Sequence, residues 1–371
     1  MSAATAAIPI SELETPALLI DLDIMQANLR KLADYSRKHS LRVRPHTKTH
    51  KIPALARKQL DLGAAGLTVA KVGEAEVMLE SESPNLLVAY PVVGSKKLER
   101  LVEVARHTSV TVSLDSLPVA VELSNAAKAG GVVFGVLAEV DVGLGRVGVP
   151  PGNELVQLIR GIERLAGLRF EGIAFYPGQI KSMDAEGERA LASLAELMER
   201  LLADLRHEGI ETRVVSGGST PTLFQSHRLP GLNEIRPGTY IFNDRNTALS
   251  GACTLEECAA SIMVTVVSTS VPHQMIVDGG SKTFSSDRPS AGSEVSFGRV
   301  LEAPDAVFTK MNEEHGFIDL HHAARNFSVG DRVQIIPNHI CVAMNLHECV
   351  YGVRGGVVEQ VWRVAGRGKL Q

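Results

Sequence analysis

The segment of residues 42–51 gathers side chains that could do covalent chemistry. It reads Arg-Val-Arg-Pro-His-Thr-Lys-Thr-His-Lys, after a short β-branched run and before a helix-favouring stretch that begins at Pro53. We therefore expect Lys48 where a strand has ended and a helix has not begun. Loss of solvent and cationic neighbours (Arg42, Arg44, His46, His50 and Lys51) would both favour the uncharged, nucleophilic amine. A solvated basic loop is the competing interpretation, because charged runs are usually exposed.

A second segment combines glycines with hydroxyl groups. Residues 216–222 read Ser-Gly-Gly-Ser-Thr-Pro-Thr and follow a predicted strand. Glycine lacks the Cβ that hinders close backbone approach, so backbone N–H groups and the hydroxyls of Ser219 and Thr220 could hold a phosphate. Taken alone, the segment could equally be an ordinary turn.

A third candidate pair lies near the carboxyl end of the chain. His339 and Cys341 are two residues apart on a segment expected to be extended, where such side chains point the same way. Imidazole and thiolate together suit a borderline-soft ion such as Zn²⁺. Two ligands do not define a metal site, and a buried apolar cysteine is the alternative.

The elements that would position these groups alternate strand and helix over the first two thirds of the chain. Eight runs, mostly apolar on both faces, are candidate strands, and helical segments lie between them. A parallel (β/α)₈ barrel fits this α/β pattern best. A doubly wound open sheet is the runner-up, but it usually carries a Gly-x-Gly-x-x-Gly turn that we do not find at the first turn. The candidate strands are residues 41–46, 65–70, 85–90, 109–114, 132–140, 170–175, 212–216 and 234–241, and helices include 73–81, 95–106, 153–166 and 185–208.

The pattern of predicted secondary structure changes near residue 250, where short β-rich runs alternate with turns. This predicts a smaller, mainly antiparallel β domain after the TIM-type barrel. We expect the barrel over residues 25–248 and the β domain, with the metal site, over 249–371. A strand within residues 1–24 is a candidate to join the β domain. The Gly-Gly-Ser-Thr segment then follows strand seven, where barrels commonly bind phosphate.

Composition excludes several classes of protein. The 371-residue chain has a net charge of −4, which gives no reason to expect nucleic acid. No apolar run reaches the length that spans a bilayer. The first seven residues lack the basic and apolar regions of a signal peptide, and the four cysteines show no Cys-x-x-Cys spacing. We therefore expect a reduced, cytoplasmic protein with no membrane partner.

The motif Pro-His-x-Lys-Thr-His-Lys, preceded by residues 15–23 (Thr-Pro-Ala-Leu-Leu-Ile-Asp-Leu-Asp), resembles the fold-type III pyridoxal 5′-phosphate (PLP) enzymes. Within that alanine racemase-like group, it resembles the family of D-threonine aldolase and D-serine dehydratase. The resemblance covers residues 13–368 and implies a barrel followed by a β domain. It also implies that Lys48 binds PLP covalently.

Further motifs extend the resemblance around the cofactor. Arg236-Pro-Gly-Thr resembles an Arg-x-Gly segment of alanine racemase, which implies Gly238 and Thr239 at the phosphate and Arg236 near the pyridine nitrogen. An ordinary salt bridge is the alternative for this arginine. Residues 141–148 resemble the family motif Asp-x-Gly-x-x-Arg-x-Gly, which implies Arg146 beside the phenolic oxygen and the substrate.

Tyr176 ends the sixth predicted strand and could pack against the PLP ring or relay a proton. A purely structural tyrosine is the alternative. In the family a His-x-Cys or His-x-Asp pair holds a divalent metal beside PLP. The resemblance therefore implies His339 and Cys341 as ligands of Zn²⁺ or Mn²⁺.

The resemblance implies a PLP- and metal-dependent lyase that acts on a small D-3-hydroxy amino acid by aldol cleavage or dehydration. It implies Lys48, Tyr176 and Arg146 as the catalytic residues. It also implies a homodimeric assembly. The His-x-Cys pair, the Gly-Gly-Ser-Thr-Pro-Thr segment and the ring-side arginine lean towards dehydration, whereas Asn-Leu-His at 345–347 follows the aldolases. An amino-acid racemase is one alternative; it needs a second base, and Tyr351 is the one tyrosine in the predicted β domain. A non-catalytic PLP carrier is the other, but such proteins resemble the barrel alone.

Overall fold

The computed structural model describes residues 8–289 and 296–371. The chain divides into two compact units: residues 31–238 with 368–371, here the barrel unit, and residues 1–30 with 239–367, here the β unit. The first seven residues of the N-terminal segment lie outside the described part. The domain limits expected from the sequence remain a proposal.

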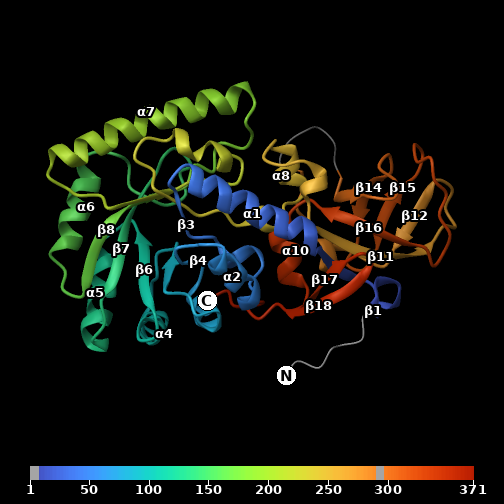
Figure 1. The fold of residues 1–371 in the computed structure, drawn as a ribbon, viewed down its shortest axis with the longest axis horizontal. Helices are drawn as coiled ribbons and strands as arrows, with labels where there is room; N and C mark the ends of the chain where they lie inside the picture. Colours follow the sequence, from blue (N-terminus) through green and yellow to red (C-terminus); the bar gives the residue numbers. More distant parts are fainter. Residues whose placement is uncertain (1–7, 290–295) are drawn as a thin grey trace. The chain divides into compact units, whose positions relative to one another are not determined.

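The barrel unit holds a sheet of eight parallel strands in the order β3-β10-β9-β8-β7-β6-β5-β4 (Figure 1). The two edges of this sheet are joined by backbone hydrogen bonds at and beside β3 and β4, because Ala65 N donates to Val43 O and Thr68 N donates to Pro45 O, both at 2.8 Å. The sheet therefore closes on itself, and the predicted barrel is confirmed. Its strands are β3 Arg42–Val43, β4 Leu67–Val69, β5 Asn85–Val88, β6 Ser109–Leu114, β7 Phe134–Val140, β8 Leu168–Phe175, β9 Val214–Gly217 and β10 Glu234–Ile235.

Helices follow the strands and cover the outside of the barrel, with α7 the longest of those labelled there in Figure 1. Each presents one apolar face; in α4, for example, the buried residues are Leu98, Leu101, Val102 and Val104, at helical spacing. Asp184 caps α7 by accepting the N–H groups of Glu186 and Gly187. The helices are α2 Pro53–Asp61, α3 Val72–Met78, α4 Ser95–Ala105, α5 Leu117–Gly130, α6 Asn153–Glu163 and α7 Ala185–His207; α1 Leu22–Lys38 runs across the division between the units.

The eighth strand is shorter than its expected span of 234–241. β10 ends at Ile235, and the chain turns into a 3₁₀ helix over Thr239–Ile241. Pro237 lacks the N–H group that a strand ladder needs, so it can only accept a backbone hydrogen bond, as its carbonyl does from His46 N at 2.9 Å. The residues expected to bind phosphate after strand eight therefore lie in a turn.

The described residues of the β unit form a ten-stranded sheet, in which β2 pairs with β17 in parallel and the other pairs are antiparallel. This confirms a mainly antiparallel second layer. β2 lies between β17 and β11, so the N-terminal strand belongs to this sheet. The strands are β1 Ile8–Pro9, β2 Ala17–Asp21, β11 Ala260–Ser268, β12 Gln274–Val277, β13 Gly298–Val300, β14 Val307–Met311, β15 Gly316–Asp319, β16 Arg332–Pro337, β17 Cys349–Arg354 and β18 Val357–Arg363; the helices are α8 Arg245–Leu249, α9 Ser281–Phe284 and α10 Ile340–Leu346.

Candidate functional site

Lys48 lies just past the carboxyl end of β3, in a 3₁₀ turn over Thr47–Thr49. The turn is capped by His46, whose Nδ1 accepts the N–H of Lys48 at 3.4 Å. The Lys48 side chain is exposed. From the sequence we expected it to lose solvent, and the protein alone does not bring this about. Two of the cationic neighbours expected for Lys48 do not surround it. Arg42 and Arg44 pair instead with Glu234 inside the barrel, at 3.6 and 3.2 Å.

Two other lysines near this end of the barrel are engaged. Lys51 Nζ is buried and lies 3.2 Å from Glu74 Oε1. Lys71 Nζ lies 3.7 Å from the centre of the Tyr90 ring. A buried ion pair is costly to break, so Lys48, with its exposed amine, is the lysine best placed to react with a ligand.

Both histidines of the lysine motif are neutral imidazoles. Burial lowers the pKa of His50 to about 4, and its Nδ1 accepts the Ile52 N–H at 3.1 Å while Nε2 lies 3.2 Å from Gln59 Oε1. Burial also lowers the pKa of His46, and the nearby positive charges of Lys48 and Arg236 lower it further. The two histidines of the motif are therefore uncharged rings and not the additional cations that the sequence suggested.

Arg236 lies just past the end of β10 and is held by neighbouring strands. Its Nη1 donates to Ser216 Oγ at 2.5 Å, and its Nη2 donates to Phe175 O at 3.1 Å. Ser216 Oγ in turn donates to Glu234 Oε1 at 2.6 Å. Burial lowers the pKa of Arg236, opposed by the carboxylates of Glu139 and Glu234. An arginine nevertheless keeps its charge in a protein, so the site holds a fixed cationic donor here.

The loop after β7 aims Arg146 at Tyr176. The guanidinium carbon lies 4.8 Å from the centre of the tyrosine ring, within cation–π range. Asp141 organises this loop, because its Oδ1 accepts the N–H groups of residues 143, 144 and 145 at 3.0 to 3.1 Å. These backbone bonds lower the pKa of Asp141. The anchoring role of Asp141 was not predicted from the sequence, although it opens the Asp-x-Gly-x-x-Arg motif.

Two glycines bring backbone close to neighbouring groups in the barrel unit. A Cβ on Gly217 would lie 2.3 Å from Phe175 Cζ, and one on Gly238 would lie 2.7 Å from Thr49 Oγ1 and 3.0 Å from His46 O. Gly238 thus packs directly against the turn that carries Lys48. Ser219 is buried, and its hydroxyl lies 3.0 Å from Thr222 Oγ1. An exposed amine and close-packed glycine backbone at this end of the barrel fit a phosphate-bearing aldehyde such as PLP.

His339 and Cys341 are not on an extended segment, and that expectation was wrong. β16 ends at Pro337, and His339 is the N-terminal cap of α10. The two side chains nevertheless meet and hydrogen-bond. Burial alone would lower the pKa of His339, but Cys341 and Asp244 outweigh it and raise that pKa to about 11.

Asp244, which was not predicted from the sequence, supports this pair. Its Oδ2 lies 3.0 Å from His339 Nδ1 and accepts the Ile340 N–H at 3.0 Å. Its Oδ1 accepts from the N–H of Thr247 at 2.8 Å and from that residue's hydroxyl at 2.7 Å, so Asp244 also caps α8. A carboxylate that holds Nδ1 leaves Nε2 of the imidazole for a metal, the usual arrangement behind metal-binding histidines.

The donors here fit an open metal site. Cys341 Sγ also lies 3.8 Å from Thr239 Oγ1. Across residues 8–289 and 296–371, no three His, Cys, Asp or Glu side chains gather as a closed metal site. Two protein ligands leave coordination positions for water and substrate, which a catalytic rather than structural metal requires.

The predicted residues divide between the two units. Lys48, Arg146, Tyr176, Ser219, Thr220, Arg236 and Gly238 belong to the barrel unit, at or after the carboxyl ends of its strands; Thr239, His339 and Cys341 belong to the β unit. Within the described residues, no helix is long and apolar enough to cross a membrane.

A parallel eight-stranded barrel with a mainly antiparallel β unit defines the alanine racemase-like class of proteins. Residues 20–246 match the alanine racemase N-terminal domain, and residues 259–353 match the putative serine dehydratase domain. D-threonine aldolase from Arthrobacter sp is 30% identical over 97% of this chain and 94% of its own. D-threo-3-hydroxyaspartate dehydratase from Delftia sp. (strain HT23) is 32% identical over 89% of this chain and 91% of its own.

Solved structures agree with these sequence matches. The crystal structure of D-threonine aldolase from Filomicrobium marinum has a TM-score of 0.93 and 32% identity, covering 100% of both chains. The Delftia dehydratase structure has a TM-score of 0.86 and 29% identity, covering 96% of this chain and 98% of its own. The chain belongs to the alanine racemase-like family of D-threonine aldolase and D-serine dehydratase.

Proposed function

We propose that this chain is a PLP- and divalent-metal-dependent lyase that acts on small D-3-hydroxy amino acids. The observation that carries this proposal is the pair His339–Cys341, held from behind by the buried carboxylate of Asp244. A racemase or a PLP carrier has no need of such a donor pair. The family, whose named members include aldolases and dehydratases, supports the same class of reaction.

We assign the cofactor to the barrel unit. Lys48 would bind PLP covalently, Ser219, Thr220, Gly238 and Thr239 would hold its phosphate, and Arg236 would face the ring nitrogen. PLP supplies an electron sink for bond cleavage at the substrate's Cα. Because Arg236 is a permanent cation that donates hydrogen bonds, it would keep the ring nitrogen unprotonated and weaken that sink.

The chain's own groups would move the protons. In dehydration the amine of Lys48 would take the α-proton of the substrate. In aldol cleavage a base instead removes the proton of the 3-hydroxyl. Arg146 would lie beside the phenolic oxygen and the substrate, and the Tyr176 ring that it contacts at 4.8 Å would pack against the cofactor or relay a proton.

We assign the metal, Zn²⁺ or Mn²⁺, to His339 and Cys341, with Asp244 fixing the imidazole. A divalent ion there would supply Lewis-acid polarisation of the 3-hydroxyl. Solved structures of D-threo-3-hydroxyaspartate dehydratase include two alanine mutants, one of a histidine and one of a cysteine two positions further on, the latter in the metal-free form. The same His-x-Cys spacing in this chain supports the assignment, and Cys341 favours dehydration over aldol cleavage.

The two reactions are separated by their products. The purified protein is assayed with D-threonine, D-serine and D-threo-3-hydroxyaspartate, with and without a chelator. Dehydration releases a 2-oxo acid and ammonia, whereas aldol cleavage releases glycine and an aldehyde. We expect 2-oxo acid formation that the chelator abolishes. Racemised amino acid as the main product, or turnover unaffected by the chelator, would overturn the proposal.

A homodimer in the cytoplasm remains part of the proposal, and sedimentation of the purified protein tests the dimer.

A further inference from the structure

A polar cavity lies in the barrel unit, at the amino-terminal ends of the strands. It has a volume of about 500 Å³ and is lined by Asn85 and Ser109, the first residues of β5 and β6, and by Arg42, the first residue of β3. Because all eight strands are parallel, this mouth of the barrel is opposite the ends that carry Lys48 and Arg236. We call this cavity, lined by Arg42, Arg44, Asn85, Thr111, Glu171 and Arg213 among others, the arginine pocket.

The arginine pocket carries an excess of positive charge. Four arginines line it, and Glu171 is the one carboxylate among the lining residues. Glu171 is already engaged, since its Oε1 lies 2.7 Å from Arg169 Nη2 and its Oε2 accepts from Thr111 Oγ1 at 3.1 Å. Glu234 faces both Arg42 and Arg44, at 3.6 and 3.2 Å. Four arginines against two carboxylates leave two cationic charges without a counterpart.

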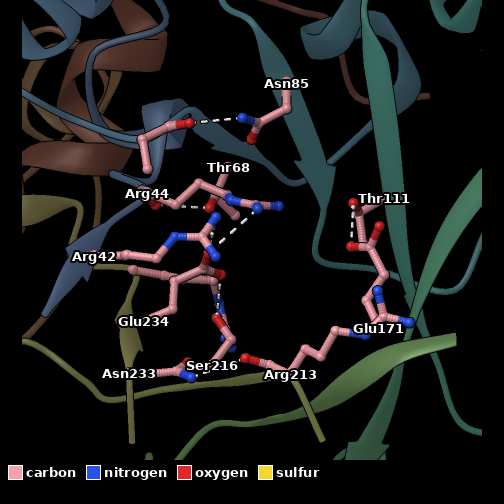
Figure 2. A network of polar contacts seen from close by, with 12 residues as sticks. Arg42, Arg44, Thr68, Asn85, Thr111, Glu171, Arg213, Ser216, Asn233 and Glu234 are labelled. Atoms are coloured by element: carbon pink, nitrogen blue, oxygen red, sulfur yellow. Dashed lines mark hydrogen bonds and ion pairs between the residues drawn. The ribbon is translucent and has the colours of Figure 1, made fainter.

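Arg44 points buried donors into this space. Its side chain is 4% exposed, yet within the described residues its Nε and Nη1 have no hydrogen-bond partner. Figure 2 shows its guanidinium extending from β3 towards the side of the barrel that carries Thr111 and Glu171. The Oδ1 atom of Asn85 is likewise buried without a partner in the described part. Buried polar groups that lack partners are costly, which makes an acceptor ligand at Arg44 favourable.

We propose that the arginine pocket binds a small multivalent oxyanion, a dicarboxylate or a phosphate compound, through Arg44, Arg42 and Arg213. Guanidinium groups match the geometry of carboxylate and phosphate and form charge-assisted hydrogen bonds with them. The volume is that of a small-molecule site rather than of a single inorganic ion. Asn85 Oδ1 is positioned to accept from a hydroxyl or amide group of the ligand.

The two exposed arginines give the clean test. Arg44→Gln would leave Glu234 buried with less compensation and could fail to fold, whereas Arg42 is 47% exposed and Arg213 is exposed. Arg200→Gln, on the outer helix α7, is the control that removes one positive charge outside the pocket. Arg42, Arg213 and Arg200 do not belong to the proposed cofactor or metal sites.

Isothermal titration of the PLP-loaded protein with malonate and, separately, with inorganic phosphate, at matched ionic strength, measures the site. We expect one equivalent of at least one anion to bind, and the dissociation constant to rise by about tenfold or more in the Arg42→Gln/Arg213→Gln double variant. The Arg200→Gln variant should bind as the unmodified protein does. Preference for malonate or for phosphate identifies the ligand as dicarboxylate or phosphate compound. No binding of either anion at millimolar concentration, or equal binding by the double variant, would overturn the proposal, and neither result would bear on the lyase assay.

Discussion

The carboxylate of Asp244 lies 3.0 Å from Nδ1 of His339, although the two residues are 95 positions apart in the chain. The same oxygen accepts the first N–H of α10, so one buried carboxylate fixes both the imidazole and the start of the helix that carries Cys341. Such a support orients Nε2 and increases the basicity of the ring towards a metal.

We therefore predict that Asp244→Asn weakens metal binding by about 10-fold to 100-fold. Asparagine still caps a helix, so the fold and the PLP absorbance should remain. Competition with a chelating indicator measures the affinity. Asp184→Asn, at the exposed cap of α7, is the control and should change nothing. Unchanged metal affinity in the Asp244 variant would remove this residue from the site.

Cys341→Ala should keep the PLP absorbance and lose most lyase activity, because the proposed thiolate ligand is removed while the barrel unit is untouched. Cys341→Asp should retain some activity and shift the preference from Zn²⁺ towards harder ions such as Mn²⁺. Activity with each metal, after removal of the original ion, measures the shift. Cys349→Ala is the matched control. Full activity of the Cys341→Ala variant would mean that this cysteine only fills space.

Borohydride reduction of the PLP-loaded protein should fix the cofactor on Lys48, because its amine is exposed at the end of β3. Peptide mapping identifies the labelled residue. Lys51 and Lys71 serve as internal controls, since the first is in a buried ion pair and the second lies over a tyrosine ring. Label on either of them would show that the assignment of Lys48 is wrong.

Gly238→Ala should weaken PLP binding by about tenfold, the effect of roughly 1.4 kcal/mol. The added Cβ would lie 3.0 Å from the backbone oxygen of His46, which cannot move aside as a flexible side chain would. The backbone of residue 238 would then be displaced from the proposed phosphate position. Fluorescence titration of the apoprotein with PLP measures the change, and an unaltered dissociation constant would argue against phosphate binding here.

His50 should make the protein less stable in mild acid. Its pKa is about 4 in the folded chain and 6.5 when unperturbed, so between these values the unfolded chain binds more protons. The free energy of unfolding therefore falls as pH drops below about 6.5, by about 2 kcal/mol between pH 7 and pH 5. Urea unfolding at both pH values measures it, and the His50→Gln variant should lose about that much of the pH dependence. Identical pH dependence in both proteins would contradict the prediction.

Strands buried on both faces were predictable because their apolar, β-branched runs are unlike those of any other element, as in β7, where every residue is buried. α10 was missed because its seven residues, Ile-Cys-Val-Ala-Met-Asn-Leu, suit a strand as well as a helix. Its buried residues, Ile340, Ala343 and Met344, show helical spacing only once burial is known. Asp244 left no local signal, because its role depends on a partner distant in sequence.

The position of Arg44 shows a second limit. It was expected to surround Lys48 because it is close in sequence. Along an extended chain, however, residues two apart lie about 6 to 7 Å from each other on the same face. Arg44 therefore lies deeper in the barrel than His46, beside Glu234. Nearness in sequence therefore did not predict how deep in the barrel this side chain lies.

The chain of contacts from Arg44 through Glu234 and Ser216 to Arg236 passes along the inside of the barrel from one mouth towards the other. Each member contacts the next, so Arg236, which we propose to face the ring nitrogen, is held by contacts that begin at the opposite mouth of the barrel. Substitutions of residues that never touch the substrate would then shift Arg236 and change how strongly the PLP ring withdraws electrons. Relatives that share every cofactor and metal ligand would still be able to diverge in which bond they break.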